Sequence, residues 1–225
     1  MIKDKIRAID LKKYAHAKYL LFIPVYMLIF MLEEKYITHG YFVSYLPLDR
    51  SIRFCEWFLI PYLLWYPLML GTGLYLFAKD VEGFKKYMQL VGCGFLAIVL
   101  FYAVFPNGQN LRPVYFPRDN ILIDAVKLLY ARDTNTNVLP SLHVFGTLAA
   151  VLAILKCDRL RDRWFRTFII VLSVFICMST VYIKQHSILD VFTGVPLACV
   201  FYCIIYRLIP NRGRSLAAGQ NAAHI

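Results

Sequence analysis

Residues 165–190 read FRTFIIVLSVFICMSTVYIKQHSILD. An apolar run over 165–183 ends in a short polar turn, and a second apolar run over 187–208 follows at once. Each run is about as long as the roughly 20 residues with which a helix crosses the core of a bilayer. The stretch therefore predicts two antiparallel membrane helices joined by a tight turn, with His186 and Asp190 near the membrane surface.

The whole chain shares this apolar character. Its 225 residues are 60% hydrophobic and 16% aromatic, which is too apolar for an ordinary soluble domain. Charge is scarce around the full circumference of each apolar run, which argues against a soluble helical core. The predicted fold class is all-α, a polytopic membrane protein with six transmembrane helices. The six predicted spans are 17–33, 56–77, 86–105, 141–156, 165–183 and 187–208.

The basic residues are unevenly distributed over these spans. With an internal N-terminus, most of the 25 lysines and arginines fall in the N-terminal segment, the two inner loops and the C-terminal segment. Positive residues favour the cytoplasmic side, so both termini are predicted to be cytoplasmic. We expect one integral membrane domain over 1–210 and a polar, disordered tail over 211–225. Composition and the absence of targeting motifs favour a bacterial plasma membrane.

The net charge of +11 also bears on partners. Most of it lies on the predicted inner face, where it would attract anionic lipid headgroups. No soluble segment carries the basic, aromatic platform of a nucleic-acid-binding protein. The predicted partner is therefore the lipid bilayer and not a nucleic acid, while the oligomeric state stays open.

His186 and Asp190 form the first candidate site. Their spacing of four residues puts both on one face of a helix. The carboxylate can accept a hydrogen bond from one ring nitrogen of His186 and leave the other nitrogen unprotonated, as a nucleophilic histidine requires. The alternative is a structural histidine at the interface, but ionisable groups inside a membrane span are costly and usually functional.

Two further predicted outer segments contribute candidates. Ser141 and His143 lie where the fourth apolar run begins, so the first turn of that helix is expected to bind an anion and His143 to protonate a leaving oxygen. The long segment 106–140 contains Arg112, which can grip a phosphate in a bidentate way, and a helical pattern from 119 to 132. The predicted topology brings Arg112, His143 and His186 to one extracytoplasmic site.

These motifs together resemble the type-2 phosphatidic acid phosphatase superfamily. The resemblance is carried by Arg112-Pro113, by Pro140-Ser141-Leu142-His143, and by Ser179-Thr180 followed by His186 and Asp190. It implies that His186 attacks phosphorus to form a phosphohistidine, that Asp190 orients it, and that His143 is the general acid. It also implies that Arg112 and Ser141 hold the phosphate, with no metal and no cofactor.

The chain departs from the family pattern at three positions. Phe105 replaces an expected lysine, Thr180 an expected arginine and Leu142 a usual glycine. Two phosphate-binding cations are therefore missing, and we hypothesise that Lys184 supplies part of the charge, with Gln109 or Asn110 as a neutral donor. The second and third motifs look closer to the branch that includes inositol-phosphorylceramide and sphingomyelin synthases.

Four functions stay open from the sequence. The first is hydrolysis of lipid phosphates or diphosphates, and the second is transfer of a phospho-headgroup to a lipid hydroxyl. The third is a metal site built from the two histidines and the aspartate, against which the anion-binding surroundings argue. The fourth is a non-catalytic protein that binds or transports a lipid headgroup.

Overall fold

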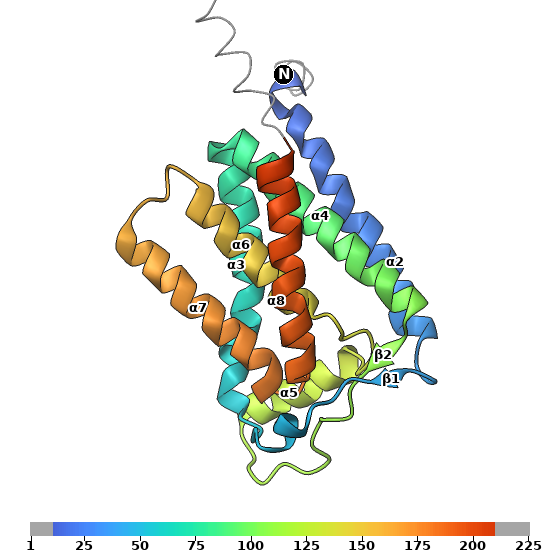
Figure 1. The fold of residues 1–225 in the computed structure, drawn as a ribbon. Helices are drawn as coiled ribbons and strands as arrows, with labels where there is room; N and C mark the ends of the chain where they lie inside the picture. Colours follow the sequence, from blue (N-terminus) through green and yellow to red (C-terminus); the bar gives the residue numbers. More distant parts are fainter. Residues whose placement is uncertain (1–10, 210–225) are drawn as a thin grey trace, which may run out of the picture.

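The computed structural model describes residues 11–209 and consists mainly of long helices that lie side by side. They run between two ends of the molecule, and one shorter helix lies across one of these ends (Figure 1). The helices are η1 (Leu11–Leu21), α2 (Phe22–Tyr36), α3 (Leu59–Lys79), α4 (Val81–Val104), α5 (Ile121–Arg132), α6 (Leu142–Lys156), α7 (Arg163–Tyr182) and α8 (Ile188–Tyr202). Short 3-10 turns at Pro47–Arg50 and Glu56–Phe58 and a π-helical end at Cys203–Leu208 complete the helical segments.

Among residues 11–209, five helical segments are long and apolar enough to cross a membrane. They are Tyr14–Tyr36, Glu56–Lys79, Val81–Val104, Arg163–Tyr182 and Ile188–Leu208. The sixth predicted span is α6, whose 15 residues extend only about 22 Å. Neighbouring helices bury most of α6 between Val144 and Ile154. Six complete spans are therefore not confirmed, although a helix lies at each predicted position.

Most of these helices begin at a residue that caps them. The side chains of Asp80, Asn120, Ser141, Asp162 and Ser187 each accept a hydrogen bond from a backbone N–H in the first turn of the following helix. Such caps satisfy N–H groups that have no partner within the helix. Two of them are next to the candidate histidines: Ser141 caps α6, which carries His143, and Ser187 caps α8 directly after His186.

The core forms where α4, α6 and α8 approach one another. Phe145 on α6 occupies the space beside Gly94 of α4, where a Cβ atom would lie only 2.0 Å from the ring. A Cβ atom on Gly194 of α8 would meet Val144 and the carbonyl of Ser141 at 3.2–3.3 Å. Gly94 lets α4 pack closely on α6, and Gly194 lets α8 and α6 pack with their capped starts next to each other.

The loops between helices gather at the end where α5 lies (Figure 1). Strand β1 (Phe42–Val43) pairs in parallel with β2 (Asn107–Gly108), so the two longest loops are joined. The helix expected over 119–132 is α5, which buries Ile123 and Val126 beneath it. The first and last described residues lie at the opposite end, whereas the predicted tail 211–225 is outside the described residues.

Candidate active site

The structure brings the two strongest sequence motifs together at the loop-bearing end. His186 Nδ1 lies 3.1 Å from Asp190 Oδ2, and His186 Nε2 lies 3.2 Å from Ser141 Oγ. His186 and Asp190 are buried, as is Ser141. With its proton on Nδ1, which Asp190 favours, His186 keeps the lone pair of Nε2 for another atom.

Asp190 is itself held by several donors. The hydroxyl of Ser44 donates to Oδ1, and the backbone N–H of Ser187 donates to Oδ2 over 2.9 Å. A buried carboxylate with this many hydrogen bonds keeps one orientation. Ser44 comes from the loop after α2, so the His186 orientation depends on a segment more than 140 residues away.

Asp49 from the same loop secures the start of α8. Its carboxylate accepts hydrogen bonds from Ser187 Oγ at 2.6 Å, Ile188 N at 2.9 Å and Leu46 N at 2.7 Å. A negative charge is favoured at the N-terminus of a helix. The sequence places Asp49 only in an outer loop, and no spacing rule connects it with α8.

Asn107 organises the other side of His186. Its side-chain oxygen accepts hydrogen bonds from the N–H groups of Val138 and Leu139, and its amide donates to the Leu139 carbonyl. The carbonyl of Val138 in turn lies 3.1 Å from His186 Nδ1. Asn107 is fully buried, and the only signal for it in the sequence was its place in a polar loop.

His143 stands opposite His186 in the first turn of α6. The centroids of the two rings are 5.8 Å apart. The His143 ring stacks on Tyr62 at 4.5 Å and lies against Trp65 at 4.6 Å. Its Nε2 atom is buried and has no hydrogen-bond partner among residues 11–209, so that nitrogen can exchange a proton with a bound molecule.

Both histidines line a cavity of about 580 Å3. One part of its wall is polar and includes Asp133, Thr136, Asn137 and Gln185. The remainder is apolar and aromatic, and it comes mainly from α2, α3 and α4: Tyr26, Met27, Phe30, Trp65, Tyr66 and Phe95. The cavity can therefore hold a molecule that has both a polar and an apolar part.

Arg112 lies behind this cavity and not on its wall. Its guanidinium donates to the carbonyls of Tyr130, Asp133 and Thr134 and to the side-chain oxygen of Gln185. Burial lowers the pKa of Arg112, while the nearby Asp133 acts in the opposite direction. In this arrangement Arg112 positions the polar wall and has few donors left for a phosphate.

The structure does not bring Lys184 or Gln109 to the cavity. Lys184 has a positive φ of 57°, and its buried ammonium donates to the carbonyls of Asp49 and Ile52 at 3.0 and 2.6 Å. Burial lowers the pKa of this lysine. Gln109 donates to the Lys184 carbonyl and accepts from Leu111 N. Both residues connect loops in this structure. They do not make the phosphate contacts that were expected from the sequence.

A metal site was one of the alternatives from the sequence. Within the described part of the chain, no three His, Cys, Asp or Glu side chains are grouped as metal ligands. Asp190 contacts His186, whose ring is 5.8 Å from that of His143.

A comparison with protein families identifies the family of the chain. The family model of the PAP2 superfamily matches residues 86–214, which is more than half of the chain. This chain belongs to the PAP2 superfamily. The superfamily consists of phosphatases and phosphotransferases that act on phosphate esters, which supports an enzyme of that general class. No curated protein and no solved structure was found to match the chain.

Proposed function

We propose that this protein is a membrane enzyme that cleaves phosphate esters of lipids through a phosphohistidine at His186. The observation that carries the proposal is the contact chain Asp190–His186–Ser141, with His143 facing the same cavity. It combines an oriented nucleophile with a separate proton donor, as covalent catalysis requires.

The reaction has two steps that share this geometry. In the first, His186 Nε2 bonds to phosphorus, the bond to the leaving oxygen breaks, and His143 gives that oxygen a proton. In the second, a hydroxyl oxygen attacks phosphorus, its proton passes to His143, and the bond to His186 breaks. No step requires a metal ion, and Asp190 stabilises the positive charge on the imidazole ring of His186.

A long apolar groove supports a lipid as the substrate. Helix α2 and helix α3 both pack on α4 but barely touch each other. The groove between them has a volume of about 360 Å3 and almost entirely apolar walls. It shares four residues with the cavity at His186, namely Tyr26, Trp65, Tyr66 and Phe95.

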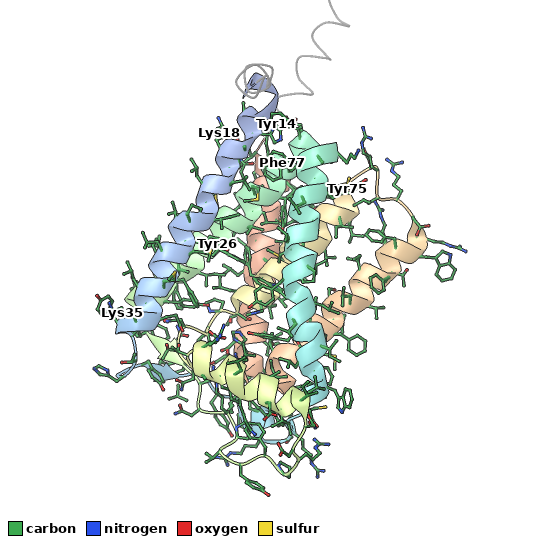
Figure 2. The ribbon with its side chains drawn as sticks, turned by 180° about the vertical axis from the view of Figure 1, so that it is seen from behind. Tyr14, Lys18, Tyr26, Lys35, Tyr75 and Phe77 are labelled. Carbon is green, nitrogen blue, oxygen red and sulfur yellow. The ribbon has the colours of Figure 1, made fainter. Side chains whose placement is uncertain are left out.

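Aromatic rings lie near the end of the groove that is far from His186, where Phe77 lines it. Figure 2 shows Tyr26 between the two helices, with Tyr14 and Phe77 nearer the first described residues. The rings of Tyr14 and Phe77 stack at 6.2 Å, and His16 lies 4.5 Å from Phe77. A hydrocarbon chain lying in this groove would place its polar end at His186.

Two acceptors fit this scheme, and one observation favours the second. With water the enzyme hydrolyses lipid phosphates or diphosphates, and with a lipid hydroxyl it transfers a phospho-headgroup. Arg132 is the only Lys or Arg among the described residues that lines the cavity, and it is exposed. A phosphate with more than one negative charge needs more positive charge beside it than Arg132 supplies. A singly charged phosphodiester donor therefore fits the cavity better, and such a donor is what headgroup transfer requires.

The proposal is tested by trapping the intermediate. Detergent-purified protein with EDTA is incubated with phosphatidic acid, diacylglycerol diphosphate, a polyprenyl diphosphate or a glycerophospholipid, and phosphate and diacylglycerol release are measured. We expect turnover of at least one donor and an acid-labile phospho-adduct on His186 after rapid quenching.

The matched variants are His186→Ala and His39→Ala. His39 is an exposed loop histidine that is bonded to its neighbour Thr38. We expect His186→Ala to lose the adduct and at least 1,000-fold in turnover, by analogy with other covalent catalysts, and His39→Ala to retain both. Turnover that survives in His186→Ala would refute the phosphohistidine mechanism.

A further inference from the structure

We propose that the polar wall of the cavity binds a primary ammonium group through Asp133 and Asn137. The donor would then be a zwitterionic phosphodiester lipid with an aminoalcohol headgroup. This inference rests on the proposed function, and it selects one class of substrate within it.

The charges around the cavity are the first argument. Its wall holds Asp133 and the exposed Arg132, and directly behind it Glu34 accepts hydrogen bonds from Thr134 Oγ1 and from Asn137 Nδ2. Arg112 is bonded to carbonyl and amide oxygens, and Lys184 points into a loop. Because Arg132 is exposed, the part of the wall around Asp133 repels a second negative charge on the substrate and attracts a positive one.

The unused acceptor atom of Asn137 is the second argument. Asn137 is 4% exposed, and its Oδ1 atom is buried without a hydrogen-bond partner in the part of the chain that the structure describes. Because Nδ2 donates to Glu34 over 2.8 Å, the orientation of the amide is fixed. Asn137 lines the cavity, and a ligand that brings a donor to it would satisfy this acceptor.

Asp133 offers acceptor capacity in the same wall. One of its oxygens, Oδ2, accepts a hydrogen bond from Gln185 Nε2 at 2.8 Å, which keeps the side chain in place. A carboxylate has about four acceptor positions, so this bond leaves room for further donors. A primary ammonium carries three N–H donors and one positive charge, which suits Asp133 and Asn137 together.

The aromatic wall supports a cation in the same place. Tyr26, Trp65 and Tyr66 line the cavity with the acceptors. Aromatic faces attract cations, most strongly when water is excluded. A trimethylammonium would gain from the rings alone, because it cannot donate to Asp133 or Asn137. We therefore expect an ethanolamine-type headgroup to bind better than a choline-type headgroup.

The chemistry of such a donor follows the proposed steps. His186 Nε2 bonds to phosphorus, the ester bond to diacylglycerol breaks, and His143 protonates the departing oxygen. The headgroup stays esterified to phosphorus, so its ammonium keeps its contacts during the step. An acceptor hydroxyl then takes the phosphoethanolamine unit and gives its proton to His143.

The test compares donors and variants with full-length protein in mixed micelles. Release of diacylglycerol is followed for phosphatidylethanolamine and phosphatidylcholine, and release of phosphate for phosphatidic acid. We expect kcat/KM to be at least tenfold higher for phosphatidylethanolamine than for phosphatidic acid, with phosphatidylcholine between them.

Asp133→Asn removes the charge and leaves an oxygen for Gln185. We expect its KM for phosphatidylethanolamine to rise at least tenfold with kcat within threefold, whereas phosphatidic acid is used as well as before or better. Asp133→Glu should recover part of the preference. The control is Asp124→Asn, an exposed change of equal charge on α5, which should alter neither donor.

A competition experiment does not depend on the folding of any variant. Ethylammonium should inhibit the wild-type protein at least tenfold more strongly than tetramethylammonium at equal ionic strength. Equal inhibition, a preference for phosphatidic acid, or an equal loss for all donors in Asp133→Asn would overturn the inference. If phosphatidic acid alone were turned over, and this turnover depended on His186, the proposed function would stand without the ammonium site. If no donor were turned over and no adduct formed, both the proposed function and this inference would be refuted.

Discussion

Asp133 is the titratable side chain through which pH should act on substrate binding. Burial and the nearby Glu34 raise the pKa of Asp133 to about 6, while Arg112, His186 and the Gln185 hydrogen bond act in the opposite direction. The carboxyl group is therefore ionised above about pH 6 and neutral below it. Only the ionised form attracts an ammonium headgroup.

We predict that KM for phosphatidylethanolamine rises as the pH falls below about 6, by up to about tenfold for each pH unit. The measurement is KM from about pH 5 to about pH 8 for wild type and Asp133→Asn, a range that brackets this pKa. Because His186 acts in the chemical step and therefore affects kcat, KM is the informative parameter. An identical pH profile in both proteins would show that another group is responsible.

The residue scale is also where sequence and structure differ most. The contact between His186 and Asp190 was expected from their spacing on one helix, but His186 lies in the turn before α8, which begins at Ile188, and Asp190 reaches back to it from the first turn of the helix. Ser44, which bonds to Asp190, belongs to a distant loop, and no local pattern reports such a contact. Lys184 was expected at the phosphate. In the structure its backbone is left-handed, and its amine donates to a loop carbonyl instead.

At the scale of elements, helix α8 depends on a loop that precedes α3. The Asp49 carboxylate accepts three hydrogen bonds and is 1% exposed, so removing it leaves buried donors without partners. We predict that Asp49→Ala lowers the free energy of unfolding by about 2–4 kcal/mol and also lowers kcat, since His186 and Asp190 flank the start of α8. Unfolding in detergent and lipid turnover measure the two effects.

The control for this change is Asp119→Asn. Asp119 has a side chain that is 92% exposed and lies 4.0 Å from Lys127, so its substitution should leave both quantities nearly unchanged. If Asp49→Ala unfolds like the control, the carboxylate does not hold α8 in solution.

The groove between α2 and α3 gives a second prediction about elements. Gly73 lines the groove, and a Cβ atom there meets only Tyr87, at an ordinary contact distance of 3.5 Å. Gly73→Phe should fill the groove and raise KM for long-chain substrates at least tenfold, while a water-soluble short-chain analogue is used as before. The comparison of the two substrates separates a blocked groove from a damaged site.

Gly71→Phe is the matched control on the same helix. A Cβ atom on Gly71 would have no described neighbour within 4 Å, and this glycine lines a different hollow, between α3 and α7. Long-chain turnover should persist in this variant. Equal losses in both variants would indicate that a bulky residue simply disturbs α3.

The element scale is the one that the sequence predicts best. Apolar runs and their polar borders place a helix at each expected position, because both length and composition are local properties. The sequence already shows that α6, with 15 residues, is short. It does not show how this helix packs in the molecule. Only the structure shows that α4, α7 and α8 pack around it.

At the scale of the whole molecule, the two ends differ in function and charge. Figure 1 places the links α3–α4 and α6–α7 at the end with the first and last described residues, while α5 and the loops of the candidate site lie at the other. Basic residues such as Lys79, Lys85, Arg159 and Arg161 belong to the first end. The positive-inside rule therefore predicts that the candidate site faces outward.

We predict that Asp119 is accessible from outside an intact cell and that Arg159 is not. In a chain without its native cysteines, Asp119→Cys should react with a membrane-impermeant thiol reagent in whole cells, and Arg159→Cys only after the membrane is opened. Both positions are exposed in the structure, so accessibility of the side chain is matched. Labelling of Arg159→Cys alone would reverse the orientation, and the lipid headgroups would then have to reach His186 from the cytoplasmic leaflet.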